Sequence, residues 1–416
     1  MDNRLRLRKR RNDAIEIDLW EGKSNTNGSR KNGDEICGWI WIRTRSRLGP
    51  GMVEIAFRGR SRVENNSLLQ PVRTYRQRNF LEMRQPIEKG CFTPYEVLEN
   101  GFLYRVPFTF IVPDKLPFHA CHHRENFSNV INCHLALPPS FGGFGENGNK
   151  SRDDNMCPVN LSIFYAVEAT VANDQAGGSR TEEAWNFASK KIFVTPFSES
   201  KIYLGAPSGL MLSQVPSKLL AARRREITEL QLESLAPRSV TIRLPSQKDA
   251  KLSTAIIPIK ITFEPGHGGA PPKLRRISRK LVAHTTAHAV LFRASATGPV
   301  RQSRQRVYTC DMSLPDLNVS SLRWQTCPPA FSDSLSVTGP DSNASDTIPG
   351  VKGSASETLL PIPVSLPQDA KLAPSFESCF ISRSYALEIG LSYRATRRMG
   401  RSFVGLKIPL ELVPEE

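Results

Sequence analysis

Apolar and polar residues alternate with a period of two wherever this chain is apolar. The clearest run is Leu161–Val171, in which Leu161, Ile163 and Tyr165 alternate with mostly small or polar neighbours. This period places successive side chains on opposite faces of an extended strand, so the run predicts a half-buried strand. The same pattern predicts strands at residues 15–19, 53–57, 108–112, 240–244, 259–263, 385–393 and 406–412.

Turn signals separate these runs and little of the chain has a helical period. Asn32-Gly33-Asp34 and Gly49-Pro50-Gly51 are typical of the turns between antiparallel strands. The best helical segment, residues 217–226, is short and ends in three arginines. We therefore predict an all-β fold of two tandem antiparallel, immunoglobulin-like β-sandwiches.

The length of 416 residues exceeds what one hydrophobic core usually supports, which also favours two domains. Three stretches are interpreted as loops: 142–156, which is rich in Gly and Asn, 172–182, and 328–357, where Ser, Pro, Gly, Asp and Thr crowd out apolar residues. The predicted division is a basic tail at 1–12, a first sandwich at 13–200, a linker at 201–225 and a second sandwich at 226–416, with an insertion near 328–357.

A weak repeat indicates that the two halves are related. Residues 117–121 (Pro-Phe-His-Ala-Cys) precede the strand around Tyr165, and residues 374–379 (Pro-Ser-Phe-Glu-Ser-Cys) precede the strand at Tyr385. We interpret this as a sign of internal duplication. Two similar sandwiches in tandem would present one long surface on which partners can be held.

The serial order of several motifs resembles the arrestin N-terminal domain. The motifs are residues 14–17, 32–40 and 53–59, followed by Phe-Thr-Phe-Ile-Val-Pro-Asp-Lys-Leu-Pro at 108–117 and Leu-Pro-Pro-Ser at 137–140. Residues 379–388 are similar to the closing strands of fungal arrestin-related proteins. The resemblance covers residues 13–200 closely and residues 226–413 more loosely.

This resemblance implies a pair of curved β-sandwiches without an active site that recruit membrane-protein cargo for endocytosis or sorting. In fungi such proteins often bring a HECT-type ubiquitin ligase to transporters through a Pro-Pro-x-Tyr motif, which binds the aromatic groove of a WW domain. This chain has no such motif. It has Pro-Pro-Ser-Phe at 138–141, which we interpret as structural, and a ligase-contact candidate formed by Pro328, Pro329 and Phe331.

The formal net charge of +16 predicts an acidic partner, and the excess is clustered. Residues 265–310 contain nine Lys or Arg and no acid. A solvated face is the simpler interpretation; the resemblance implies contact with anionic lipid or phosphorylated cargo tails. Nucleic acid is not expected, because no aromatic residues interleave with the charge. The candidate acidic-partner residues are Arg4, Arg6, Arg8, Lys9, Arg10, Arg11, Lys273, Arg275, Arg276, Arg279 and Lys280, and the first run is also a candidate nuclear-import signal.

Ser278 is a candidate phosphorylation site. It follows Arg275-Arg276-Ile277, and basophilic kinases recognise such paired arginines through acidic pockets. A phosphate would add up to about −2 charge to a basic segment and so change any contact with an acidic partner.

The sequence offers no residues that clearly carry catalysis, so we predict a protein that is not an enzyme and needs no cofactor or metal. Gly-x-Gly-x-x-Gly at 143–148 lacks a strand before it and a helix after it, which favours a loop. His284 and His288 lie four apart with no carboxylate nearby in sequence and are interpreted as packing or surface residues. A zinc site is the alternative for six irregularly spaced residues: His119, Cys121, His122, His123, Cys133 and His134.

No apolar run reaches the roughly 18–20 residues that span a bilayer, and the eight scattered cysteines are typical of reduced thiols. We expect a soluble cytoplasmic protein that works at the surface of the plasma membrane or endosomes. Two functions remain open: an arrestin-like adaptor that couples cargo to sorting or ubiquitylation, and a structural coat subunit that resembles the arrestin-fold component of retromer.

Overall fold

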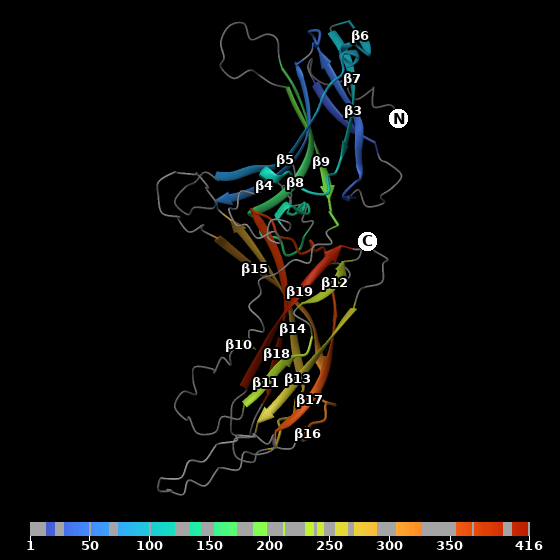
Figure 1. Ribbon diagram of the computed structural model, residues 1–416. Helices are drawn as coiled ribbons and strands as arrows, with labels where there is room; N and C mark the ends of the chain where they lie inside the picture. Colours follow the sequence, from blue (N-terminus) through green and yellow to red (C-terminus); the bar gives the residue numbers. More distant parts are fainter. Residues whose placement is uncertain are drawn as a thin grey trace, which may run out of the picture.

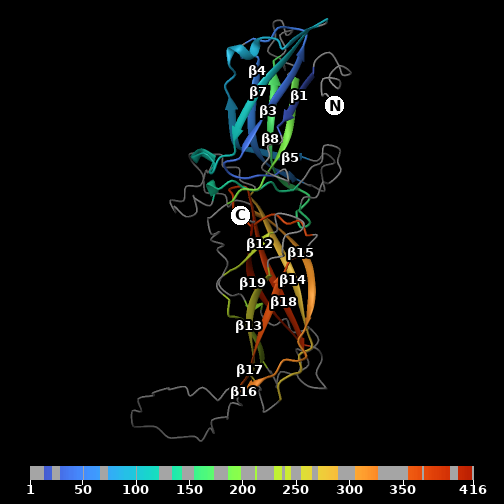
Figure 2. The same cartoon turned by 90° about the vertical axis from the view of Figure 1, so that its right-hand side faces the viewer.

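The computed structural model describes residues 14–20, 29–49, 51–65, 74–99, 101–120, 134–142, 154–172, 186–197, 211–212, 229–236, 239–244, 254–264, 270–288, 305–326, 355–367, 370–393 and 402–414. The strands form two bodies that lie end to end (Figure 1), and the perpendicular view shows the same elongated arrangement (Figure 2). The last strand of the chain ends beside the point where the two bodies meet (Figure 1).

Two sheets form the first body. One has the order β1-β3-β7-β6 and consists of β1 (Ala14–Leu19), β3 (Glu35–Thr44), β7 (Gly101–Ile111) and β6 (Glu96–Leu98). The other has the order β2-β9-β8-β4-β5 and consists of β2 (Ser29–Arg30), β9 (Asn186–Val194), β8 (Leu161–Val171), β4 (Val53–Asn65) and β5 (Thr74–Gln85). Two short 3-10 helices, η1 (Lys89–Phe92) and η2 (Phe118–Ala120), lie in the connections.

The second body also contains two sheets. One has the order β11-β13-β17-β16, formed by β11 (Glu229–Ser234), β13 (Thr254–Glu264), β17 (Ser356–Ser365) and β16 (Gln325–Thr326). The other has the order β10-β19-β18-β14-β15, with β12 also paired to β19; its strands are β10 (Met211–Leu212), β12 (Val240–Leu244), β14 (Arg276–His288), β15 (Gln305–Asn318), β18 (Ile381–Tyr393) and β19 (Ser402–Pro414). All pairings are antiparallel except the short pairs β2–β9 and β12–β19.

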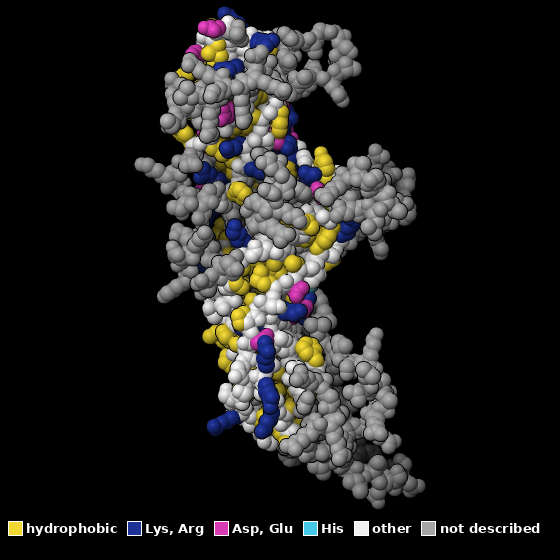
Figure 3. Space-filling model, turned by 180° about the vertical axis from the view of Figure 1, so that it is seen from behind, with side chains coloured by type: hydrophobic (Ala, Val, Ile, Leu, Met, Phe, Trp, Pro, Cys, Tyr) yellow, Lys and Arg dark blue, Asp and Glu magenta, His cyan; other side chains and the backbone are white. Residues whose placement is uncertain are grey.

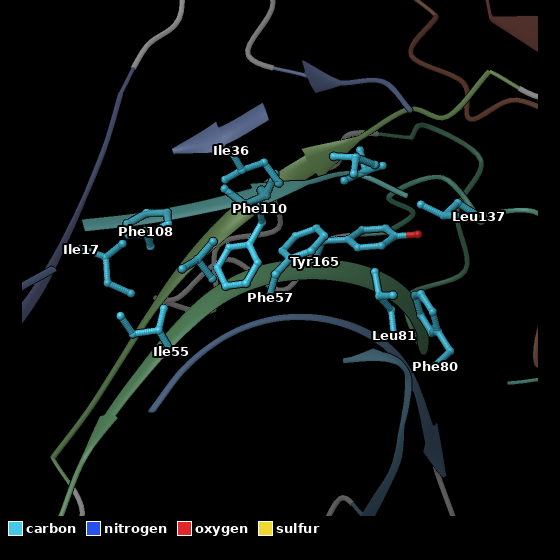
Figure 4. Close-up of a cluster of buried hydrophobic side chains, with 14 of the residues drawn as sticks. Ile17, Ile36, Ile55, Phe57, Phe80, Leu81, Phe108, Phe110, Leu137 and Tyr165 are labelled. Carbon is cyan, nitrogen blue, oxygen red and sulfur yellow. The ribbon is translucent and has the colours of Figure 1, made fainter. Parts of the chain in front are cut away.

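Each body buries the apolar side of both its sheets in one core, which makes it a β-sandwich. In the first sandwich, the Phe57 ring from one sheet stacks on Tyr165 at 5.9 Å and meets Phe110 from the other sheet at 6.0 Å (Figure 4). In the second sandwich, Ile261 and Leu387 are fully buried members of the shared core. Burial of alternate residues from facing sheets is what the period-two pattern predicts.

The predicted all-β fold is confirmed, and each predicted run lies within a strand or, at residue 112, one position beyond it. The sheets of the first sandwich use strands between residues 14 and 194, and those of the second use strands between 211 and 414. Part of the segment predicted as a linker, β10, pairs with β19. The predicted helix at 217–226 lies outside the described residues, and the last residues of the predicted insertion belong to β17.

Candidate functional site

The sequence Pro-Ser-Phe occurs once in each sandwich, at residues 139–141 and 374–376, beside the junction between the two bodies. In the first copy, Ser140 N–H donates to Val194 O at 2.7 Å and Ser140 Oγ accepts from Val194 N–H at 2.9 Å. In the second copy, Ser375 makes the same two bonds with Leu412, at 2.8 and 3.0 Å. Each serine therefore ties its segment to the last strand of its own sandwich.

A buried tyrosine completes the repeated structure. Tyr165 OH donates to Pro138 O at 2.6 Å, and Tyr385 OH donates to Ala373 O at 2.7 Å; both carbonyls belong to the residue just before Pro-Ser-Phe. Burial raises the pKa of both phenols, so both stay protonated donors. These shared contacts support an internal duplication, but our pairing of residues 117–121 with 374–379 was wrong, because the structural equivalent of 374–376 is 139–141.

The two copies differ at the residue that lies two positions before the tyrosine. Phe141 forms an isolated bridge with Ile163, and Phe376 forms the equivalent bridge with Arg383. Ile163 is buried in the core of the first sandwich. Arg383 is also almost fully buried, at 1 % exposure, although it carries a charge. A buried charge requires partners, and those of Arg383 lie at the junction.

Arg383 binds residues 154–156 with its guanidinium group; this segment leads into β8 of the first sandwich, while Met156 itself packs in the core of the second sandwich. Nη1 donates to Met156 O at 3.1 Å and to Thr285 Oγ1 in its own sandwich, and Nη2 lies 3.4 Å from Asp154 Oδ2. Asp154 also accepts the N–H groups of Met156 at 2.8 Å and of Ala373 at 3.3 Å. Asp154 and Arg383 therefore hold the segment that precedes β8 against the second sandwich at the junction.

Aromatic rings pack around this ion pair. The guanidinium carbon of Arg383 lies 5.4 Å from the centre of the Phe141 ring, and the Phe141 and Phe376 rings meet edge to face at 5.6 Å. Burial raises the pKa of Asp154, and the nearby charge of Arg383 opposes this rise. The junction therefore joins the bodies through the repeated segments themselves.

A second feature is an exposed aromatic surface on the outer side of the sheet β1-β3-β7-β6. In β3 the inward residues Ile36, Ile40 and Ile42 are buried in the core, while the outward positions between them include Trp39 and Trp41. An open sheet usually presents polar side chains to water, so the two tryptophans on this outer face, which are paired with Glu16 and Asp18 of β1, are unusual. Figure 2 views the molecule from the side on which this sheet lies.

Five residues define what we call the aromatic face: Trp20, Trp39, Trp41, Tyr95 and Arg105. The guanidinium carbon of Arg105 lies 3.6 Å from the centre of the Trp39 ring and 5.5 Å from that of Tyr95. Trp41 meets Tyr95 edge to face at 5.5 Å, and Trp20 meets Trp39 at 6.5 Å. Trp20 is 61 % and Tyr95 45 % exposed. Trp, Tyr and Arg are the residues that dominate binding energy at protein interfaces.

The outer side of the other sheet of the first sandwich carries an arginine–glutamate network. Arg60 and Arg58 both donate to the buried carboxylate of Glu168, with Arg58 at 2.8 Å, and Arg58 also bonds Glu82 at 3.1 Å. Burial works to lower the pKa of Arg58, but the hydrogen bonds with Glu168 and Glu82 raise it overall. Because both arginines are bonded to glutamates of the same sheet, we interpret them as structural.

The predicted basic cluster at residues 273–280 is divided between exposed side chains and one buried side chain. Lys273, Arg275, Arg276 and Lys280 are exposed, although Arg276 pairs with Asp316 and Lys280 lies 3.3 Å from Asp311. Arg279 is 7 % exposed and donates to the carbonyls of Pro315 and Pro363. Lys and Arg lie along both sandwiches on the face that Figure 3 shows, and over the second sandwich they form a narrow line.

Ser278 lies inside β14, a strand that is paired on both sides. Its side chain is exposed on the outer face, and its hydroxyl donates to Gly390 O at 3.1 Å. A kinase would have to withdraw this strand to bind it in extended form. Phosphorylation at Ser278 remains a prediction.

Several predicted residues lie outside the described part of the chain. These are the ligase-contact candidate (Pro328, Pro329 and Phe331), the basic run from Arg4 to Arg11 and the glycine-rich loop at 143–148. Of the residues considered for zinc, only His119 and His134 are described, and His134 Nε2 lies 3.5 Å from Glu377 Oε1 across the junction. Within the described ranges, no group of three or more His, Cys, Asp or Glu side chains could hold a metal ion.

The sequence analysis did not predict the aromatic face or the junction. Trp39-Ile40-Trp41-Ile42 does carry a signal for the aromatic face, because consecutive apolar residues place apolar side chains on both faces of the strand. His284, which we interpreted as a packing or surface residue, lies on the outer face with its Nε2 2.7 Å from Lys407 Nζ.

No helix among the described residues is long and apolar enough to cross a membrane. No protein-family model matches the chain, and no curated protein matches its sequence.

Proposed function

We propose that this protein is an adaptor of the arrestin-like type that binds membrane-protein cargo without catalysing a reaction itself. The observation that carries the proposal is the aromatic face, an exposed surface with the composition of a binding interface on a rigid β-sandwich. The junction supports it, because it holds two sandwiches as one extended body on which a cargo tail and a second partner can bind together.

The proposed place of action is the cytoplasmic surface of the plasma membrane or endosomes, with anionic lipid as a further candidate partner of the basic residues. Recruitment of a HECT-type ligase through Pro328, Pro329 and Phe331 is part of the same proposal. Affinity purification of the native protein under gentle conditions should recover membrane transporters, with or without a ligase. Recovery of neither would contradict the adaptor function.

A structural coat subunit is the second candidate. It is favoured by exposed apolar side chains on the second sandwich as well, such as Ile256 at 67 % and Leu359 at 57 % exposure. Gel filtration of the native complex separates the two functions. A coat subunit elutes entirely in a complex of fixed stoichiometry, whereas an adaptor is found largely free.

A further inference from the structure

The second sandwich has a long sheet edge that no described strand covers. β15 is the last strand of the order β10-β19-β18-β14-β15, so only its β14 side is paired. It runs for 14 residues, and Val307, Thr309, Asp311 and Ser313 on its outward face are exposed. An open edge presents unpaired N–H and C=O groups, which can accept another strand.

Two other sheet edges, at β17 and β5, are protected against strand addition. β17 pairs with β16 only at residues 356–357, and further along it carries Pro361 and Pro363, which cannot donate to a new strand. β5 carries Arg76, Glu82 and Arg84 along its edge, and a register irregularity at Gly59/Arg60 interrupts its pairing. An added strand would therefore find few backbone donors on the edge of β17 and a charged, irregular edge on β5.

β15 is less protected, with a proline near one end and one exposed arginine, Arg306, near the other. Pro315 lies beside the irregularity between Ile277 and Arg279, where the register with β14 shifts. Val319 N–H donates to Arg275 O at 3.0 Å, so the odd-numbered residues of β14 bond toward β15. Beyond the shift, these residues are opposite the even-numbered residues of β15, so the N–H groups of Val307, Thr309, Asp311 and Ser313 face the open side. The stretch 305–313 contains no proline, and its charged residues are Arg306 and Asp311.

The side chains of β15 indicate what the added strand would look like. Tyr308 packs against the core of the first sandwich, while Cys310 and Met312 pack against that of the second, so the inward side of the edge is apolar and lies beside the junction. Thr309 and Asp311 are exposed on the outward side. An added strand would therefore place apolar residues inward at alternate positions and polar or basic residues outward.

We propose that the edge of β15 binds an extended segment of a cargo tail as an additional β-strand. The proposal deepens the adaptor function and rests on it for the identity of the partner. Affinity comes from backbone hydrogen bonds, and selectivity comes from alternate side chains over Cys310 and Met312. A second copy of this chain, paired edge to edge, is the alternative occupant.

Two variants of one residue isolate the backbone contribution. Thr309→Pro removes an outward N–H, whereas Thr309→Val keeps it; both lose the same 3.3 Å hydrogen bond with His284. Peptides selected on the purified full chain from a random library displayed on phage serve as probes. Binding of the labelled peptides, measured by fluorescence anisotropy, should weaken at least about tenfold with Thr309→Pro and stay within about twofold with Thr309→Val.

Hydrogen exchange locates the bound peptide. The amides of Val307, Asp311 and Ser313 should gain protection in the complex. Ser313→Pro, which blocks the edge at a different position, replaces Thr309→Pro if that variant does not fold. The proposal is overturned if no peptide is selected, if both Thr309 variants bind equally, or if light scattering shows a dimer that Thr309→Pro dissociates.

The same variants separate this proposal from the adaptor function. If Thr309→Pro recovers as much membrane cargo from cells as the wild-type chain, the edge proposal is wrong and the adaptor function stands. If neither chain recovers membrane cargo, the adaptor function is wrong.

Discussion

At the scale of single residues, the decisive feature is a charge that is buried at the junction, where it bonds the segment that leads into the first sandwich. Arg383 occupies the position that Ile163 holds in the first copy of the repeat. Where Ile163 packs in an apolar core, Arg383 bonds Asp154. Sequence alone gives no sign of this pair, because its members are 229 positions apart and the run around Arg383 alternates as any strand does. In contrast, the inward position of Arg279 could have been predicted. Ile277 and Leu281 lie two positions away on either side, so all three side chains point to the same face of the strand.

The ion pair predicts a large effect of removing one partner. Arg383→Met leaves the Asp154 carboxylate buried without its cation and should lower the free energy of unfolding by about 3–5 kcal/mol. Urea denaturation measures this, and adding Asp154→Asn should restore part of the loss. Arg276→Met, which breaks an exposed pair in the same sandwich, serves as the control and should change stability by less than about 1 kcal/mol. Equal effects of Arg383→Met and Arg276→Met would contradict the role of the junction.

His284 predicts a dependence of stability on pH. Burial lowers its pKa from the ordinary 6.5, and the nearby Lys407 lowers it further. The unfolded chain therefore binds a proton at this histidine before the folded chain does, so stability should fall as the pH drops below 6.5. Urea midpoints on either side of that pH should show this fall in the wild type and a smaller one in His284→Gln. An unchanged slope in the variant would assign the dependence to other groups.

At the scale of elements, the strands could be predicted and their partners could not. Alternation decides which residues face a core, so runs such as Leu161–Val171 were predicted correctly. Pairing depends on long-range contacts, and the strand β10 in the expected linker has only two residues to signal it. The repeated Pro-Ser-Phe segments lie outside the strands, where alternation carries no information.

The repeat predicts matched effects in the two sandwiches. Tyr165→Phe and Tyr385→Phe each leave one buried carbonyl without its donor and should each cost about 1–3 kcal/mol of unfolding free energy. Tyr75→Phe, at a tyrosine that is 57 % exposed, should have little effect. Thermal or urea denaturation of the three variants tests this. A marked loss in only one of the two buried variants would show that the copies are not equivalent.

At the scale of the whole molecule, two sandwiches form one extended body with binding features at different places. The aromatic face lies on the outer side of the sheet β1-β3-β7-β6 in the first sandwich, and the open edge of β15 runs along the second sandwich beside the junction. Composition predicted a binding protein with an acidic partner. It did not locate the binding surface, because exposure depends on which strands are covered.

The central claim is that the aromatic face binds membrane-protein cargo, and proximity labelling in living cells tests it most directly. The chain is compared with a Trp20→Ser/Trp41→Ser variant and with Phe187→Ser, a control at a 56 % exposed position on the other sheet of the same sandwich. We predict that the wild type and Phe187→Ser label the same membrane proteins and that the double variant loses them while staying folded. Equal labelling by all three chains, or labelling of no membrane protein by the wild type, would contradict the claim.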